Sequence, residues 1–170
     1  MYHSLKQAKK TPVYLAEAGL IGGAYAALCL ILAPISYGPL QVRVAEALTI
    51  LPLFTPAAIP GLTMGCLIAN LFSGGAAGGW DWLFGTLTTL VAALVTYMLR
   101  RWPVLATLPP VLFNAVVIGA ELAVVGSSHF SWPLFWLFAA QVGAGQLIAC
   151  TGGGLLLYSG LRRTKWGRQS

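Results

Sequence analysis

Six polar side chains interrupt the apolar segments of this 170-residue chain and have the chemistry needed to bind a small planar ligand. A carboxylate accepts two parallel N–H donors, such as the ring N–H and exocyclic amine of a guanine-like base, and a carboxamide both donates and accepts hydrogen bonds. These side-chain types therefore indicate a site for a nucleobase-like ligand if the fold brings the residues together. The candidates are Arg43, Glu46, Asn70, Asn114, Glu121 and Gln141.

Most of these residues also have a purely structural interpretation. Arg43 and Glu46 are three residues apart and could neutralise one another on one helix face. The three carboxamides could instead form hydrogen bonds that hold membrane helices together. Glu121 has the least obvious structural partner, and ionisable groups inside membranes usually mark functional sites, so it is the strongest functional candidate.

The composition predicts a membrane protein. Charged residues make up 8% of the chain and hydrophobic residues 58%, whereas about a quarter of the residues in soluble domains are charged. Half of the charged side chains lie in the two tails, so the long central segment is almost free of charge. The charged tail residues are Lys6, Lys9, Lys10, Arg162, Arg163, Lys165 and Arg168.

Six membrane-spanning helices account for the length at about 20 residues per helix. We expect one all-α integral membrane domain over residues 1–170, with spans at about 13–33, 41–54, 57–72, 80–99, 104–125 and 133–161. The second span is short and contains Arg43 and Glu46, so it is not an ordinary lipid-facing helix. The first continues past a cleavage-like Ala24-Tyr25-Ala26 pattern, which favours a retained helix over a signal peptide.

Basic residues predict the orientation of the chain. The clusters at 6–10, 100–101 and 162–168 fall on one side of the membrane if there are six crossings, and such clusters face the cytoplasm. Both termini are therefore expected to be cytoplasmic. The loops at 34–39 and 127–131 and the glycine-rich loop at 73–79 then lie outside.

The predicted depth of the polar candidates indicates a pocket open to the exterior. They come from four spans yet share the outer leaflet, and Asn114 lies two helical turns before Glu121 on the same face. A charged group at the bilayer centre costs about 2.5 to 3.5 kcal/mol, so these groups should face one another or a cavity. A conducting pore would place polar groups at several depths.

Aromatic residues near the outer ends of the helices could stack on a planar ligand. Tyr37 and Trp80 are the main candidates, followed by Trp82 and Phe130. The alternative is that they form the aromatic belt found at membrane interfaces.

The first helix carries two rows of small residues at four-residue spacing. Gly19, Gly23 and Ala27 form one row, and the second consists of Ala18, Gly22 and Ala26. Small residues let another helix backbone approach closely in a membrane. The pattern predicts a helix contact, either within the chain or with a separate protein.

The sequence lacks the motifs that mark several classes of function. No G-x-x-x-x-G-K-[ST] phosphate loop occurs, so ATP-driven work must use another polypeptide. His3 and His129 lie in a tail and a loop, and neither a nucleophile motif nor a metal-ligand spacing is present, so we expect no enzyme, no metal and no cofactor. The cysteines lie singly in apolar runs, and the placement of the basic residues argues against nucleic-acid binding.

Four segments resemble the QueT family of queuosine-precursor transporters. Prolines, an Arg-x-x-Glu and two asparagines recur at matching places, and the resemblance covers nearly the whole chain. The segments are 32–48 (LAPISYGPLQVRVAEAL), 55–62 (TPAAIPGL), 65–70 (GCLIAN) and 108–114 (LPPVLFN).

The resemblance implies a six-helix S component of an energy-coupling factor (ECF) transporter in the bacterial cell membrane. Such a subunit captures its ligand outside and associates with a transmembrane T subunit and two cytoplasmic ATPases. The row of Gly19, Gly23 and Ala27 would contact the T subunit, and the implied cargo is a 7-deazaguanine precursor of queuosine, or queuine. The chain departs from the family at Gln146, where an acidic residue is expected, and this exchange bears on cargo preference if the position touches ligand.

Two functions from different classes remain open at this stage. The leading hypothesis is a substrate-binding subunit of an ECF importer, which binds its ligand alone but transports only with partners. The alternative is a small membrane scaffold or assembly protein without a small-molecule ligand, in which the polar residues only hold helices together. A self-sufficient proton-coupled carrier is disfavoured because Glu121 is the only plausible proton carrier in the later helices.

Overall fold

The computed structural model describes residues 12–36, 42–73, 80–127 and 129–164, and these residues form helices without any strand. The predicted all-α class is therefore confirmed for this part of the chain. In order, the helices are α2 (Pro12–Ile31), α3 (Ala33–Ser36), the 3₁₀ helix η1 (Val44–Leu53), α4 (Ala58–Ser73), α5 (Asp81–Met98), the short η3 (Leu105–Thr107), α6 (Leu108–Val125), α7 (Trp132–Gln146), the π-helical η4 (Leu147–Gly153) and α8 (Gly154–Leu161).

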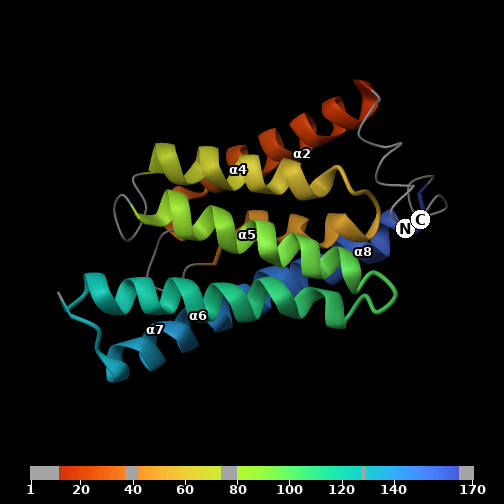
Figure 1. The fold of residues 1–170 in the computed structure, drawn as a ribbon. Coiled ribbons are helices and arrows are strands. Elements are labelled where there is room, and N and C mark those ends of the chain that lie inside the picture. Colours follow the sequence, from red (N-terminus) through yellow and green to blue (C-terminus); the bar gives the residue numbers. More distant parts are fainter. Residues whose placement is uncertain (1–11, 37–41, 74–79, 128, 165–170) are drawn as a thin grey trace.

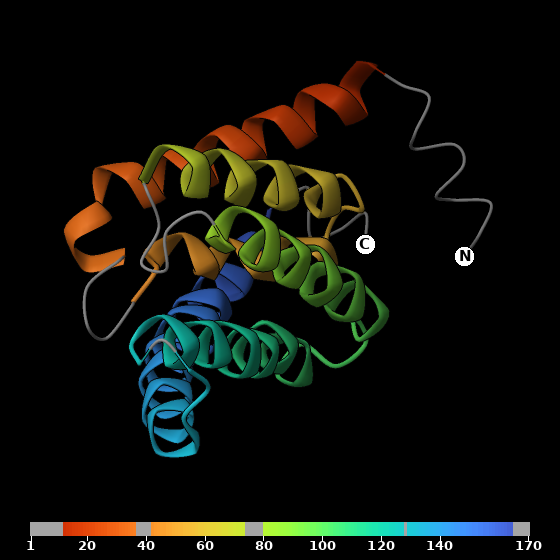
Figure 2. The same ribbon diagram turned by 60° about the vertical axis from the view of Figure 1, so that its left-hand side comes forward.

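The helices run back and forth along one bundle axis (Figure 1). Helices α2 and α4 form one side and α6 and α7 the other, with α5 between them (Figure 2). The 3₁₀ helix η1 contacts α2, α4, α5, η4 and α8, so it is the central element. Polar residues on η1 are therefore enclosed by other helices.

Proline fixes where several of these helices begin. Pro12 is the first residue of α2, and α6 and α7 each carry proline in the first turn. The ring sets a helical φ, and the missing N–H is one that has no partner in the first turn of a helix. Pro52 lies inside η1, where it cannot donate an α-helical hydrogen bond.

The 3₁₀ form of η1 compensates for its shortness. Its ten residues rise by about 2.0 Å each, so the segment spans roughly 20 Å instead of roughly 15 Å for an α-helix. The expectation that this segment is not an ordinary lipid-facing helix is confirmed, because seven of its ten residues are buried.

The last pass is a continuous helical run from Trp132 to Leu161 with a π-helical segment in the middle. This segment packs on η1, and a Cβ placed on Gly153 would lie 3.0 Å from the Ala47 Cβ. Single π turns inside α-helices often occur at functional sites.

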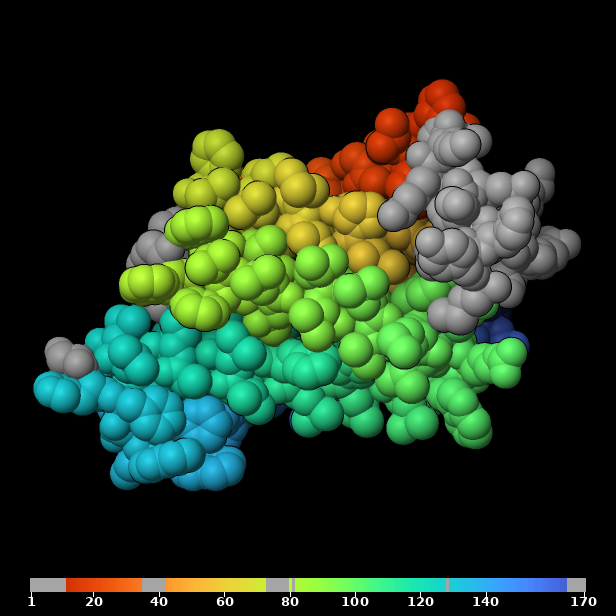
Figure 3. All heavy atoms as spheres, in the orientation of Figure 1, coloured from red at the N-terminus to blue at the C-terminus, as the bar shows by residue number. Residues whose placement is uncertain are grey.

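The exterior of the bundle is suited to lipid. On α5, the large apolar side chains of Leu87, Val91, Leu94 and Met98 point outward, whereas Thr96 on the same helix is fully buried. Helices α4, α5 and α6 form one continuous face (Figure 3). Larger apolar residues outside and small or polar residues inside are the pattern expected of a protein surrounded by lipid.

Three of the helical runs are long and apolar enough to cross a membrane: Pro12–Ile31, Leu105–Val125 and Trp132–Leu161. Three shorter apolar helices complete the bundle at Val44–Leu53, Ala58–Phe72 and Trp82–Met98. The start of α2, the connection between α5 and α6, and the end of α8 lie at one end of the bundle (Figure 1). Arg100 and Arg162 belong to this end, and the N-terminal basic cluster lies outside the described residues.

Candidate binding site

Polar side chains from four elements meet inside the bundle. We call this set the buried polar cluster. At its centre, the Tyr25 hydroxyl on α2 donates a hydrogen bond of 2.5 Å to Oε1 of Glu46 on η1. Glu46 is only 1% exposed. The cluster consists of Tyr25, Arg43, Glu46, Thr49, Cys66, Asn70 and Thr89.

The second half of the cluster joins η1 to α4 and α5. A terminal guanidinium nitrogen of Arg43 donates to Oδ1 of Asn70 at 3.2 Å. The Asn70 amide in turn donates to Sγ of Cys66, which also accepts a hydrogen bond from the Thr89 hydroxyl. Cys66, which is a single cysteine in an apolar run of the sequence, therefore belongs to this hydrogen-bonded network.

The side chains of Arg43 and Glu46 have different hydrogen-bond partners. Among the described residues, Glu46 hydrogen-bonds to Tyr25 and Arg43 to Asn70, so neither side chain depends on the other alone. Oε2 of Glu46 is buried and has no hydrogen-bond partner among the described residues. A buried carboxylate oxygen of this kind is costly unless a further donor reaches it.

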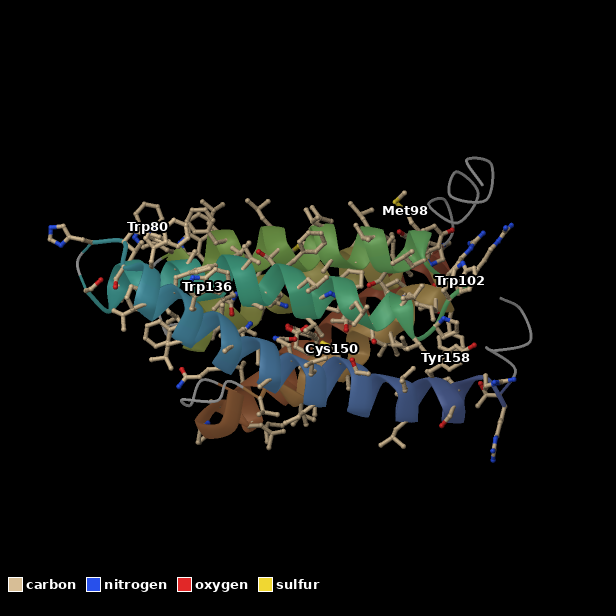
Figure 4. All side chains as sticks on the ribbon, turned by 90° about the horizontal axis from the view of Figure 1, so that it is seen from below. Trp80, Met98, Trp102, Trp136, Cys150 and Tyr158 are labelled. Atoms are coloured by element: carbon tan, nitrogen blue, oxygen red, sulfur yellow. The ribbon has the colours of Figure 1, made fainter. Side chains whose placement is uncertain are left out.

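Asn114 is buried, and its amide donates to the backbone carbonyl of Pro110 at 2.9 Å. Gln146 is also buried, at the junction of α7 and η4, and its Oε1 accepts a hydrogen bond from the Cys150 thiol at 3.0 Å. Cys150 lies about midway between the ends of the bundle marked by Trp80 and Trp102 (Figure 4). Gln141 is partly buried on α7.

Glu121 lies in a different place from the buried polar cluster. It lines a cavity of about 630 Å³ between α5 and α6, and both of its carboxylate oxygens are shielded from solvent. The rest of the lining is apolar or aromatic: Trp80, Phe84, Val116, Val117, Ala120, Val124, Val125 and Phe130. We call this cavity the α5–α6 groove.

The aromatic candidates have separate locations. Trp80 and Phe130 line the α5–α6 groove and are 60% and 46% exposed, and the Trp80 ring centroid lies 6.1 Å from that of Phe84. Trp82 is exposed on α5, and Tyr37 lies outside the described residues. Trp80 and Trp136 occupy one end of the bundle and Trp102 the other, as in an interfacial aromatic belt (Figure 4).

The two rows of small residues on α2 face different surroundings. A Cβ placed on Gly22 would lie 2.8 Å from the backbone oxygen of Gly61, and one on Gly65 would lie 2.6 Å from the backbone oxygen of Gly22. This row therefore packs directly on α4. A Cβ on Gly19 or Gly23 would meet nothing within 4 Å, and Ala27 is likewise exposed.

Comparison with known proteins identifies the family. A model of the QueT transporter family matches residues 15–163, which is most of the chain. The chain belongs to the QueT transporter family. Searches of curated proteins and of solved structures give no match.

Membership confirms the resemblance seen in the four sequence segments. It makes the chain a membrane protein of a transporter family, in agreement with its apolar helices. QueT is not a family of enzymes. Among the described residues of this QueT-family chain, the buried polar cluster holds a buried carboxylate oxygen, and the α5–α6 groove combines aromatic side chains with Glu121 around a cavity.

Proposed function

We propose that the chain is the substrate-binding S component of an ECF-type importer in the bacterial plasma membrane. It captures a queuosine precursor, a 7-deazaguanine base or queuine, from outside and passes it to the cytoplasm. The observation that carries the proposal is Glu46, a buried carboxylate inside an apolar bundle whose Oε1 accepts from Tyr25 and whose Oε2 has no hydrogen-bond partner among the described residues. An ionisable group is costly inside a membrane protein, and such groups typically mark functional sites.

The buried polar cluster matches the hydrogen-bonding edge of a deazaguanine. The ring N–H and exocyclic amine of the base donate toward the Glu46 carboxylate, whose oxygens each have two acceptor positions. Arg43 and the amide of Asn70 supply donors for the adjacent ring carbonyl. Asn114, Glu121 and Gln141 remain proposed ligand residues outside this cluster, with Trp80 and Tyr37 as proposed stacking residues.

The proposed partners follow from what the chain lacks and what it exposes. No phosphate loop is present in the sequence, so ATP hydrolysis belongs to two cytoplasmic ATPases on other chains. The row of Gly19, Gly23 and Ala27 is open to a close helix contact, which we assign to the T subunit. The basic end of the bundle then faces the cytoplasm with both termini.

The test is a titration of the detergent-purified chain with queuine, its aminomethyl and cyano base precursors, guanine, and riboflavin as an unrelated control. We expect saturable binding that favours the deazaguanines over riboflavin, without any ATPase activity. Absence of saturable binding to all five compounds would reject the proposed cargo and favour the membrane-scaffold alternative.

Gly85→Ala tests whether the Arg43–Asn70 pair belongs to the site. A Cβ at this position would lie 2.8 Å from the Asn70 amide nitrogen, so the side chain must move and its bond with Arg43 weakens. We expect about tenfold weaker deazaguanine binding with little change in the unfolding temperature, since hydrogen bonds to charged groups contribute about 1.5 to 3 kcal/mol.

The matched control for this variant is Gly143→Ala, whose added Cβ makes an ordinary 3.5 Å contact with the Ala115 Cβ. It should bind like the unaltered chain. Equal affinity in both alanine variants would show that Asn70 does not contribute to ligand binding.

A further inference from the structure

The sequence gives Tyr25 no role in ligand binding, yet its side chain contacts the most enclosed charged group of the buried polar cluster. The side chain is completely buried, and its hydroxyl donates to Oε1 of Glu46 at 2.5 Å. Hydrogen bonds to a carboxylate are shorter and stronger than those between neutral groups. This contact therefore fixes the direction in which the carboxylate points.

The backbone of Glu46 is also held by hydrogen bonds. Its backbone N–H donates to the carbonyl of Arg43 at 2.9 Å, and its own carbonyl accepts from the Thr49 hydroxyl at 2.6 Å. Oε2 alone has no hydrogen-bond partner among the described residues, although it is buried. A carboxylate held in this way presents Oε2 and the remaining acceptor position of Oε1 to incoming donors.

Helix α4 packs closely against Tyr25. A Cβ placed on Gly65 would lie 3.0 Å from the Tyr25 Cβ, so glycine leaves the space that the tyrosine uses. Tyr25 also belongs to the apolar core formed with Leu62 and Cys66. Phenylalanine would keep this packing and remove only the hydroxyl.

We propose that Tyr25 is a positioning residue for ligand recognition. By occupying Oε1, its hydroxyl orients the Glu46 carboxylate so that Oε2 meets an N–H group of the ligand, without touching the ligand itself. This inference rests on the proposed function, because it needs a ligand with such a donor. A preoriented acceptor also avoids the cost of ordering the side chain during binding.

A double-mutant cycle tests the role of Tyr25. Affinities for queuine and for the aminomethyl-7-deazaguanine base are measured with the unaltered chain, the two single variants Tyr25→Phe and Glu46→Gln, and the double variant. We expect Tyr25→Phe to raise Kd about tenfold in the unaltered background and to have almost no effect in the Glu46→Gln background, because Tyr25 acts through that carboxylate.

Tyr97→Phe is the matched control. Its hydroxyl accepts a hydrogen bond from Arg100 at 2.9 Å, at the basic end of the bundle, so its removal should leave Kd unchanged. The unfolding temperature of each variant separates lost binding from lost folding. If Tyr25→Phe does not fold, infrared difference spectra of the unaltered chain with and without queuine take its place. A tyrosine C–O band should then shift on binding, and Glu46→Gln should abolish this shift.

The outcomes separate the two proposals. If the unaltered chain binds queuine and Tyr25→Phe binds equally well, or loses the same affinity in both backgrounds, the positioning role is wrong while the proposed function stands. A tyrosine C–O band that does not shift when queuine binds would also show that the positioning role is wrong. If the unaltered chain binds neither base, the proposed function fails and the role of Tyr25 fails with it.

Discussion

Replacing Glu46 by glutamine is expected to weaken deazaguanine binding at least about 100-fold while the chain remains folded. The substitution keeps the shape of the side chain and an oxygen that can accept from Tyr25. It replaces the other carboxylate oxygen by a nitrogen that donates. Two charge-assisted hydrogen bonds to the base are then lost or opposed, and each is worth about 1.5 to 3 kcal/mol.

Glu17 provides the matched control for this experiment. It also lies in a helix of the bundle, and Oε2 of its carboxylate accepts a hydrogen bond from Thr55 at 3.0 Å. Glu17 lies outside the buried polar cluster, so Glu17→Gln should leave the affinity unchanged. Isothermal titration calorimetry with queuine measures both variants, and equal affinity would remove Glu46 from the proposed site.

Glu121→Gln distinguishes the two candidate places in the structure. Glu121 lines the α5–α6 groove, whereas Glu46 lies within the buried polar cluster. A loss of binding in both variants would extend the ligand site from the cluster toward the groove. A loss confined to Glu46→Gln would restrict ligand binding to the cluster.

The sequence could predict the kind of fold because each signal was local. Apolar runs, proline at helix starts and basic clusters each depend on a few neighbouring residues, and together they indicate an all-helical membrane bundle. The 3₁₀ form of η1 and the π-helical η4 depend instead on how the two elements pack against each other. No local pattern reports that packing.

Some members of the buried polar cluster could be predicted from the sequence for a similar reason. Arg43, Glu46 and Asn70 stand out because charged or carboxamide groups are rare in apolar segments, and in the structure Glu46 bonds to Tyr25 and Arg43 to Asn70 within the buried polar cluster. Tyr25 was missed because tyrosine is common in membrane helices, and only the fold shows that its hydroxyl points at a carboxylate. Helical spacing placed Asn114 and Glu121 on one face, but spacing does not determine which cavity each residue lines.

The two rows on α2 show the same limit. Both rows have small residues at the same four-residue spacing in the sequence, and only the position of α4 reveals that the row containing Gly22 is buried while the row containing Gly23 is open. We therefore expect Gly22 and Gly23, which are neighbours on one helix, to have different roles. Gly22 maintains the packing of α2 on α4, and Gly23 is available to a partner.

We expect Gly22→Val to prevent normal packing of α2 on α4, and Gly23→Val to leave the isolated chain intact. The Cβ at Gly22 would lie 2.8 Å from a backbone oxygen of Gly61, so the two helices must separate. Overpacking of this kind typically costs about 1 to 3 kcal/mol, and more when backbone must move. Thermal unfolding in detergent should therefore show a large loss of stability for Gly22→Val alone.

The same pair of variants tests the assigned partner surface. Gly23→Val should bind queuine normally in isolation but fail to co-purify with the T subunit and ATPases, because its side chain fills the open row on α2. Uptake of the base by cells should fall accordingly. Normal co-purification and uptake with Gly23→Val would show that this row is not the partner contact, since the close backbone approach that the row permits would then be unnecessary for assembly.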